Sequence, residues 1–151
     1  MNLADIILPE HTFIGVSVGT KWRALQTISE KAGRAFGVEE QAIIRALESR
    51  ESLGSTGIGN GIAVPHAAIP GMTTPRGLLV RFAQPLDFEA IDDIPVDIAF
   101  MLLFGENNRG EYLNVLAAIA RRLQAPGVLD SMRKARKAEE LYSDFIADSR
   151  L

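Results

Sequence analysis

The sequence contains no cysteine and has little excess charge, because 16 Lys and Arg residues nearly balance 19 Asp and Glu residues and leave a net charge of −3. Without cysteine, the chain has no disulfide, no thiolate nucleophile and no cysteine-ligated metal. Without an excess of positive charge, it lacks the broad field that attracts nucleic acid or an anionic membrane surface. We therefore expect no nucleic-acid partner.

Long hydrophobic runs are also missing from the chain. No apolar stretch approaches the roughly 20 residues that span a bilayer. The first residues, MNLADIILPEHTF, carry an acidic residue where a secretory signal would be basic, and Pro9 interrupts their apolar run. These features predict that the protein does not insert into a membrane and that it is cytoplasmic.

The length and composition are those of a globular protein. The chain has 151 residues, of which 47% are hydrophobic, and a domain of this size buries roughly 68–70% of the surface that its unfolded chain exposes. No internal repeat, low-complexity tract or Pro/Ser-rich linker divides the sequence. We therefore expect a single domain over residues 1–151.

The hydrophobic pattern predicts helices at both ends of the chain and strands between them. Thr20 is a candidate N-cap for the first helix, and Gly37 is a candidate stop. A group of strands with helices before and after it in the sequence is typical of a layered α/β or α+β domain. The expected helices are 21–36, 39–51, 111–123, 127–136 and 138–148, and the expected strands are 62–64, 77–82 and 95–104, the last one buried on both faces.

Helical spacing also predicts which side chains face the core. In the first helix, Trp22 and Leu25 fall on the apolar face, and in helix 111–123 Leu113 and Leu116 do so. These residues are expected to be buried.

The stretch GSTGIGNGIAVPH, residues 54–66, is the first candidate for function. A phosphate-binding P-loop requires Gly-Lys-Ser/Thr, but here Ile62 follows Gly61, and the same residue breaks the dinucleotide-binding glycine pattern. Asn60-Gly61 indicates a type I′ hairpin that ends before Pro65. The glycines and hydroxyls before it are compatible both with an anion-binding nest and with a plain turn.

His66 follows this stretch and is the strongest single candidate for chemistry. A neutral imidazole is both a nucleophile and a leaving group near pH 7, and Arg50 upstream offers a guanidinium that neutralises a phosphoryl group. A histidine that is merely hydrogen-bonded in a turn is the alternative. A zinc site needs three or four ligands, and the only other histidine, His11, is expected to be a surface loop residue, so we expect no metal and no cofactor.

Three other charged groups have structural interpretations. The basic cluster Arg133–Lys137 is followed by acidic residues and is expected to form a solvated helix face. The carboxylates in the loop 87–93 are expected to be solvated surface groups and not a catalytic acid/base pair. Asp97 lies inside an apolar run and is expected to cap or pair structurally rather than to catalyse.

The residues SRESLGSTGIGNGIAVPH (49–66) resemble the active-site signature of the IIA components of the bacterial phosphotransferase system, of the fructose/mannitol and nitrogen-regulatory type. The segment LDFEAIDDIPVDIAFMLL (86–103) is similar to a second segment of that family. The resemblance extends over nearly the whole chain. It implies that family's fold: a single α/β domain with a central mixed β-sheet flanked by helices.

The resemblance also implies roles for individual residues. His66 matches the histidine that accepts a phosphoryl group on Nε2 from a histidine phosphocarrier protein, and Arg50 matches the active-site arginine. Ser55, Thr56 and Gly57 match the loop that lines the phosphoryl site. The implied activity is a phosphotransferase with a phosphohistidine intermediate.

Two positions depart from the family pattern. Ala67 replaces the glycine that usually follows the histidine, which exchanges one small residue for another. Tyr112, also assigned to the phosphoryl site, stands where the family carries a second active-site histidine. A phenol donates and accepts hydrogen bonds, but it supplies no positive charge at neutral pH.

The resemblance leaves three functions open. The expectation of a free-standing IIA domain and the motif GSTGIGNGIA (54–63) favour the nitrogen-regulatory branch. In that branch the phosphorylation state of the protein regulates a protein partner. A fructose-type IIA would instead pass its phosphoryl group to a separate IIB protein. A regulatory binding module that no longer takes part in phosphotransfer, because of Tyr112, is the third.

Overall fold

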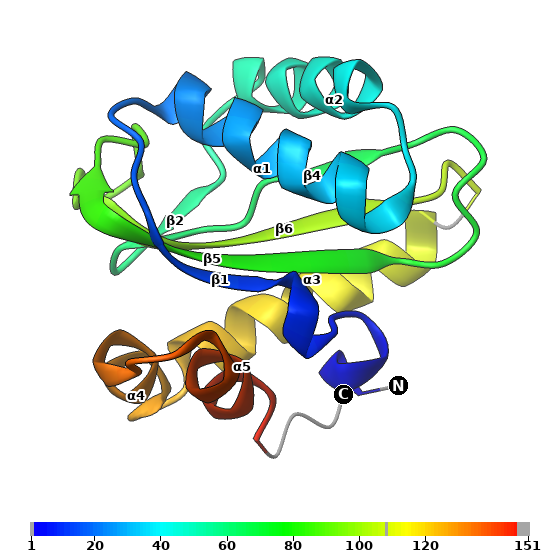
Figure 1. Ribbon diagram of the computed structural model, residues 1–151. Helices are drawn as coiled ribbons and strands as arrows, with labels where there is room; N and C mark the ends of the chain where they lie inside the picture. Colours follow the sequence, from blue (N-terminus) through cyan, green and yellow to red (C-terminus); the bar gives the residue numbers. More distant parts are fainter. Residues whose placement is uncertain (1, 108, 148–151) are drawn as a thin grey trace.

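The computed structural model describes residues 2–107 and 109–147 (Figure 1). Two short 3-10 turns, Leu3–Asp5 and Pro9–His11, come first. The elements that follow are β1 (Thr12–Val16), α1 (Lys21–Phe36), α2 (Glu40–Ser52), β2 (Gly57–Gly59), β3 (Ile62–Ala63), β4 (His66–Ala68), β5 (Arg76–Leu86), β6 (Val96–Phe104), α3 (Arg109–Gln124), α4 (Val128–Lys134) and α5 (Ala138–Ile146).

Within the described residues the strands form one six-stranded mixed sheet with the order β1-β5-β6-β3-β2, and β4 also pairs with β6. β5 and β6 are antiparallel, whereas β1 is parallel to β5 and both β3 and β4 are parallel to β6. Figure 1 shows α1 and α2 over one face of this sheet and α3, α4 and α5 over the other. The predicted α/β class, with a central mixed sheet flanked by helices, is confirmed.

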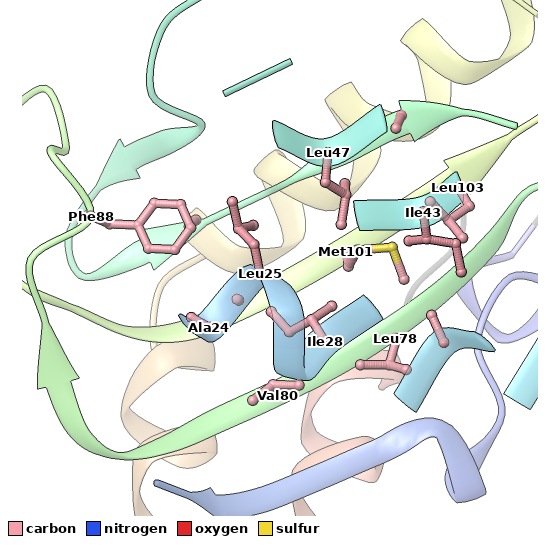
Figure 2. Close-up of a cluster of buried hydrophobic side chains, with 14 of the residues drawn as sticks. Ala24, Leu25, Ile28, Ile43, Leu47, Leu78, Val80, Phe88, Met101 and Leu103 are labelled. Carbon is pink, nitrogen blue, oxygen red and sulfur yellow. The ribbon is translucent and has the colours of Figure 1, made fainter. Parts of the chain in front are cut away.

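The sheet separates two apolar cores because side chains alternate along β5 and β6. Leu78 and Met101 belong to the core under α1 and α2 (Figure 2), and Leu79 and Phe100 belong to the core over α3–α5. The prediction that 95–104 is buried on both faces is confirmed, since all but one of the residues of β6 are buried.

The strand β1 was not expected, and the description of the chain as starting with helices is wrong. Its residues Thr12 and Phe13 pair with Leu79 and Val80 of β5 in parallel register. A five-residue strand that contains a glycine has little periodic signal of its own. Its partner lies far along the chain, so local sequence does not reveal the pairing.

Helix α1 has the predicted ends but a different inward face. The Thr20 hydroxyl accepts a hydrogen bond from the backbone N–H of Arg23 at 3.2 Å, and Gly37 closes the helix with a φ of 66°. Trp22, however, is 41% exposed, while Lys21 is buried. The predicted burial of Trp22 is therefore wrong, and the neighbouring residue Lys21 faces inward in its place.

Helix α3 shows a similar displacement at its start. Leu113 is 58% exposed, whereas Val115, Ile119 and Leu123 are buried. The predicted burial of Leu113 is wrong. Helices α1 and α3 are the longest ones described, with 16 residues each, and no described helix has the length and apolarity to cross a bilayer.

The predicted hairpin exists, and charged residues hold its turn on both sides. Asn60 and Gly61 both have positive φ, 58° and 80°, as a type I′ turn requires. The Asn60 N–H donates to Asp92 at 2.9 Å, and Arg133 donates to the Asn60 carbonyl at 2.6 Å and pairs with Asp97 at 2.8 Å. The structural role expected for Asp97 is confirmed. Arg133, which was expected to be a solvated helix residue, instead binds the turn of the hairpin and Asp97.

The hairpin leads directly into β4, which places His66 beside the central strand β6. β3 ends at Ala63, before Pro65, and β4 begins at His66. β4 pairs with β6 in parallel, with His66 opposite Leu102, and the Leu102 N–H donates to the Pro65 carbonyl at 2.9 Å. The histidine backbone is therefore held by the central strand of the sheet.

Candidate functional site

A cavity of about 290 Å³ lies where the end of α2, the segment after it, the β3–β4 connection and α3 meet. It contains four of the residues that the sequence singled out, together with an apolar wall. Its lining residues are Arg50, Ser55, Thr56, Ile58, Val64, His66, Leu116, Ala117 and Ala120. Neither Gly57 nor Tyr112 lines it.

The His66 ring has one hydrogen-bonding arrangement that satisfies both nitrogens. Nδ1 lies 2.9 Å from the backbone carbonyl of Val64, and because a carbonyl only accepts, Nδ1 carries the proton. Nε2 is then the unprotonated nitrogen, and it accepts a hydrogen bond from Nε of Arg50 at 3.2 Å. The tautomer that results presents a basic nitrogen next to the guanidinium.

Arg50 comes from the last turn of α2 and has a second partner. Its Nη1 donates to the carbonyl of Gly54 at 2.9 Å, while Nε faces His66. The guanidinium is planar, so two bonds in different directions fix its orientation. Arg50 is thus held between its own loop and the imidazole.

The environment lowers the pKa of His66 below 6.5. Burial is the largest cause, because it disfavours the charged imidazolium, and the positive charge of Arg50 acts in the same direction. The Val64 carbonyl and Glu51 oppose this shift in pKa. The ring is therefore neutral, and nucleophilic at Nε2, around neutral pH.

Ser55 and Gly57 hold the loop against the segment that follows β5. The Ser55 hydroxyl donates to the Phe88 carbonyl at 2.7 Å and accepts from the Gly57 N–H at 3.0 Å. A Cβ on Gly57 would lie 2.8 Å from the Cβ of Ala90, so this glycine is required by close packing. Ser55 lines the cavity, but its hydroxyl is bonded to the protein itself.

The nest interpretation of the loop finds little support in its hydrogen bonds. The N–H groups of Leu53, Gly54, Thr56 and Gly57 all donate to acceptors of the protein. An anion in the cavity would have to compete with these bonds for the four N–H groups, whereas Arg50 brings a positive charge to the cavity.

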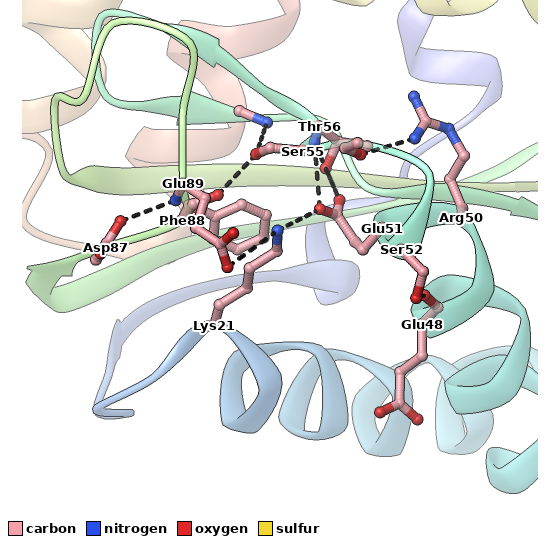
Figure 3. Close-up of polar contacts among 12 residues, drawn as sticks. Lys21, Glu48, Arg50, Glu51, Ser52, Ser55, Thr56, Asp87, Phe88 and Glu89 are labelled. Carbon is pink, nitrogen blue, oxygen red and sulfur yellow. Dashed lines mark hydrogen bonds and ion pairs between the residues drawn. The ribbon is translucent and has the colours of Figure 1, made fainter.

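Two charged residues that sequence reasoning missed lie beneath the loop (Figure 3). Lys21 Nζ and Glu51 Oε2 are 2.8 Å apart, and their side chains are 5% and 0% exposed. Glu51 also accepts hydrogen bonds from the backbone N–H and the hydroxyl of Thr56. A signal was present, since Lys21 precedes Leu25 by one turn and Glu51 follows Leu47 by one turn, which places opposite charges on two apolar helix faces.

Tyr112 is near the histidine but outside the cavity lining. Its ring stacks on Phe104, with centroids 3.8 Å apart and planes 5° apart, and its centroid lies 6.5 Å from that of the His66 ring. The position that carries a second histidine in the family pattern is therefore next to His66.

The other histidine has a packing role. His11 lies half-buried in the turn Pro9–His11, not in a loop, and its ring meets Phe36 edge-on at 5.1 Å. In the part of the chain that the structure describes, no cluster of three or more His, Asp or Glu residues is arranged to hold a metal ion.

The chain matches the protein family described as "Phosphoenolpyruvate-dependent sugar phosphotransferase system, EIIA 2" over residues 5–148. It is 37% identical over 143 residues to the nitrogen regulatory protein of Bradyrhizobium diazoefficiens, a match that covers 95% of this chain and 94% of that protein. The fructose-specific EIIA component of Haloferax volcanii is 31% identical over 130 residues, covering 85% and 84% of the two chains.

A solved structure is similar over the same extent. The crystal structure of nitrogen regulatory protein IIA-Ntr from Neisseria meningitidis superimposes with a TM-score of 0.89 at 31% identity, covering 95% of this chain and 98% of that one. The likeness therefore extends over nearly the whole length of both chains.

Proposed function

Because the chain belongs to the EIIA 2 family of the phosphoenolpyruvate-dependent sugar phosphotransferase system, we propose that it is a phosphocarrier whose acceptor is Nε2 of His66. The observation that carries the proposal is the arrangement around that ring. Val64 holds the proton on Nδ1, and Arg50 faces the free Nε2. The donor in this proposal is a phosphorylated histidine phosphocarrier protein.

The proposed step is a transfer between two imidazoles. The lone pair of His66 Nε2 forms the new N–P bond, while the N–P bond of the donor breaks and its electron pair returns to the donor nitrogen. The Nδ1 proton stays on its bond to the Val64 carbonyl throughout. No protein base has to remove a proton, so catalysis reduces to positioning and charge stabilisation.

Arg50 supplies the charge stabilisation in this step. Its bond to Nε2 has to break when phosphorus approaches, which leaves the Nε–H free to donate to a phosphoryl oxygen. The bond from Nη1 to the Gly54 carbonyl keeps the guanidinium at the site meanwhile. A fixed cation of this kind stabilises the charge of the transferring group.

We place the protein in the nitrogen-regulatory branch, where the phosphorylation state of His66 would control a protein partner. Supporting this are relatives named nitrogen regulatory protein that match nearly the full length of both chains. The fructose-specific relative matches less of each chain at lower identity. In a sugar-transport role, the protein would need a separate IIB partner with a cysteine, since this chain has none.

A second candidate function is a binding module without phosphotransfer. The observation that favours it is Tyr112, which stacks on Phe104 beside His66 at a position where the family pattern has a histidine. In this case the domain would bind its partner without ever being phosphorylated.

The test is intact mass spectrometry after incubation with phosphoenolpyruvate, enzyme I and a histidine phosphocarrier protein. We expect a single phosphoryl adduct that is stable at alkaline pH and lost in acid, as phosphohistidine is. His66→Ala should remove it. His11→Ala is the matched control and should keep it, because His11 is the only other histidine.

The alternative outcomes separate the candidates. An adduct that persists in His66→Ala would contradict the assignment of the acceptor. No adduct at all, with donor proteins active on a control IIA, would support the binding module.

A further inference from the structure

We propose that Glu51 is a positioning residue that fixes, through Thr56 and Gly54, the orientation of both His66 and Arg50. This inference rests on the proposed acceptor function of His66. Glu51 does not line the cavity, so it acts through residues that are hydrogen-bonded to it. Figure 3 shows its carboxylate between Lys21 and the loop before β2.

Stability alone does not explain the buried pair of Lys21 and Glu51. Both side chains are almost fully buried, and their charged atoms are 2.8 Å apart. Removing two charges from water has a high desolvation cost, and apolar residues of similar volume are often as stabilising. Glu89, at 4.0 Å from Lys21 and largely exposed, is too distant and too solvated to replace Glu51 as the partner. The pair has a geometric consequence instead.

The first consequence concerns Nδ1 of His66. The Glu51 carboxylate accepts hydrogen bonds from the N–H and O–H of Thr56. The Thr56 carbonyl in turn accepts from the Val64 N–H at 2.9 Å, and the Val64 carbonyl accepts from His66 Nδ1 at 2.9 Å. A continuous series of hydrogen bonds therefore runs from the buried carboxylate to the ring proton.

The second consequence concerns Nε2. The backbone carbonyl of Glu51 accepts from the Gly54 N–H at 3.1 Å, and the Gly54 carbonyl accepts from Nη1 of Arg50 at 2.9 Å. The same guanidinium donates to Nε2 of His66 at 3.2 Å. Gly54 lies in the short segment between Glu51 and Thr56, so a displacement of Thr56 would also move the carbonyl that holds Arg50.

The substitution Glu51→Gln tests this arrangement. Glu51 accepts from Lys21 Nζ and from the N–H and O–H of Thr56 with two charged oxygens. Gln is uncharged and has one acceptor oxygen, so it leaves the charge of Lys21 uncompensated and weakens the bonds that hold Thr56. We expect the loop to loosen, the preference of His66 for the Nδ1–H tautomer to weaken, and the phosphorylation rate to fall by about tenfold or more, as misplacement of a reacting group does. The ring tautomer is read from the ¹⁵N chemical shifts of the two imidazole nitrogens in the unphosphorylated protein.

Glu48→Gln is the matched control. It makes the same chemical change one turn earlier in α2, and Figure 3 shows the Glu48 carboxylate pointing away from Thr56. We expect it to keep the wild-type ¹⁵N shifts and rate. A folded Glu51→Gln protein that also keeps both would overturn the proposal, and so would a changed tautomer with an unchanged rate.

Thr56→Val is the second variant, for the case in which Glu51→Gln does not fold. It leaves Lys21 and Glu51 paired, so no buried charge loses its partner, and it removes only the hydroxyl link to the loop. We expect a change in the His66 ¹⁵N shifts and a slower transfer, and unchanged shifts and rate would overturn the proposal.

The tautomer measurement also separates this inference from the proposed function. It needs no phosphoryl donor. Altered ¹⁵N shifts in the Glu51 and Thr56 variants, with no phosphorylation of any form of the protein, would mean that the positioning network exists and that the acceptor function fails.

Discussion

Arg50 and His66 share a hydrogen bond in which the guanidinium Nε donates to the imidazole Nε2 over 3.2 Å. The two residues belong to different layers of the fold, since Arg50 lies in the last turn of α2 and His66 begins β4. The bond brings a permanent positive charge to the one ring nitrogen that has a free lone pair. It therefore influences both the pKa of the histidine and the group that can bind there.

The first prediction is that His66 titrates below 6.5. Burial lowers its pKa most, and Arg50 lowers it further. In an NMR titration of the ring Cε1–H, we expect a midpoint below that of an exposed histidine. Arg50→Gln should raise the pKa of His66, because it removes the neighbouring charge. A wild-type midpoint at or above 6.5 would contradict this prediction.

The same shift in pKa makes stability depend on pH. The unfolded chain, with an ordinary histidine pKa of 6.5, binds protons more readily than the folded protein, so the free energy of unfolding falls as pH drops from 6.5 through the lower folded pKa. His11 contributes in the same direction, because burial also lowers its pKa. Urea unfolding of His66→Ala and His11→Ala across this range would separate the two contributions.

The second prediction concerns the guanidinium. Arg50→Lys keeps the positive charge but cannot bond Gly54 and His66 through separate nitrogens. We expect the rate of phosphoryl transfer to fall by about 10²-fold, the usual loss for one transition-state donor. Single-turnover phosphorylation followed by mass spectrometry would measure it.

Arg45→Lys is the control for this experiment, since Arg45 is exposed on the same helix. It should transfer at the wild-type rate. Equal rates for Arg50→Lys and Arg45→Lys would mean that charge alone, without the guanidinium fork, is sufficient.

The third prediction concerns Tyr112, whose ring lies 6.5 Å from that of His66. An imidazole carries a positive charge when protonated, which a phenol does not. We therefore expect Tyr112→His to accelerate phosphorylation of His66 in the same single-turnover assay. Slower or unchanged transfer would show that the tyrosine does not limit the reaction.

Four of the residues that line the cavity could be assigned to one site from the sequence. Arg50, Ser55, Thr56 and His66 are close in sequence or follow a recognisable hairpin, and the resemblance assigned them to one site. Each of them lines the cavity. Local sequence was sufficient because the loop and the hairpin are contiguous.

Long-range pairing is where sequence reasoning failed. Strand β1 finds its parallel partner in β5, and Arg133 crosses from α4 to the Asn60 carbonyl. Neither contact has a local signal. Lys21 was missed for a related reason. A lysine is rarely buried without a partner, and its partner, the buried Glu51, lies on another helix.

The fourth prediction is that Gly57→Ala destabilises the protein. A Cβ at this position would lie 2.8 Å from the Cβ and 2.9 Å from the Cα of Ala90, so backbone would have to move, at a cost of about 1–3 kcal/mol in the free energy of unfolding. Gly19→Ala is the control, since its Cβ would meet nothing within 4 Å. Urea unfolding would measure both variants. Equal stability of the two would mean that the segment around Ala90 yields freely, and that Ser55 is not held rigidly against it.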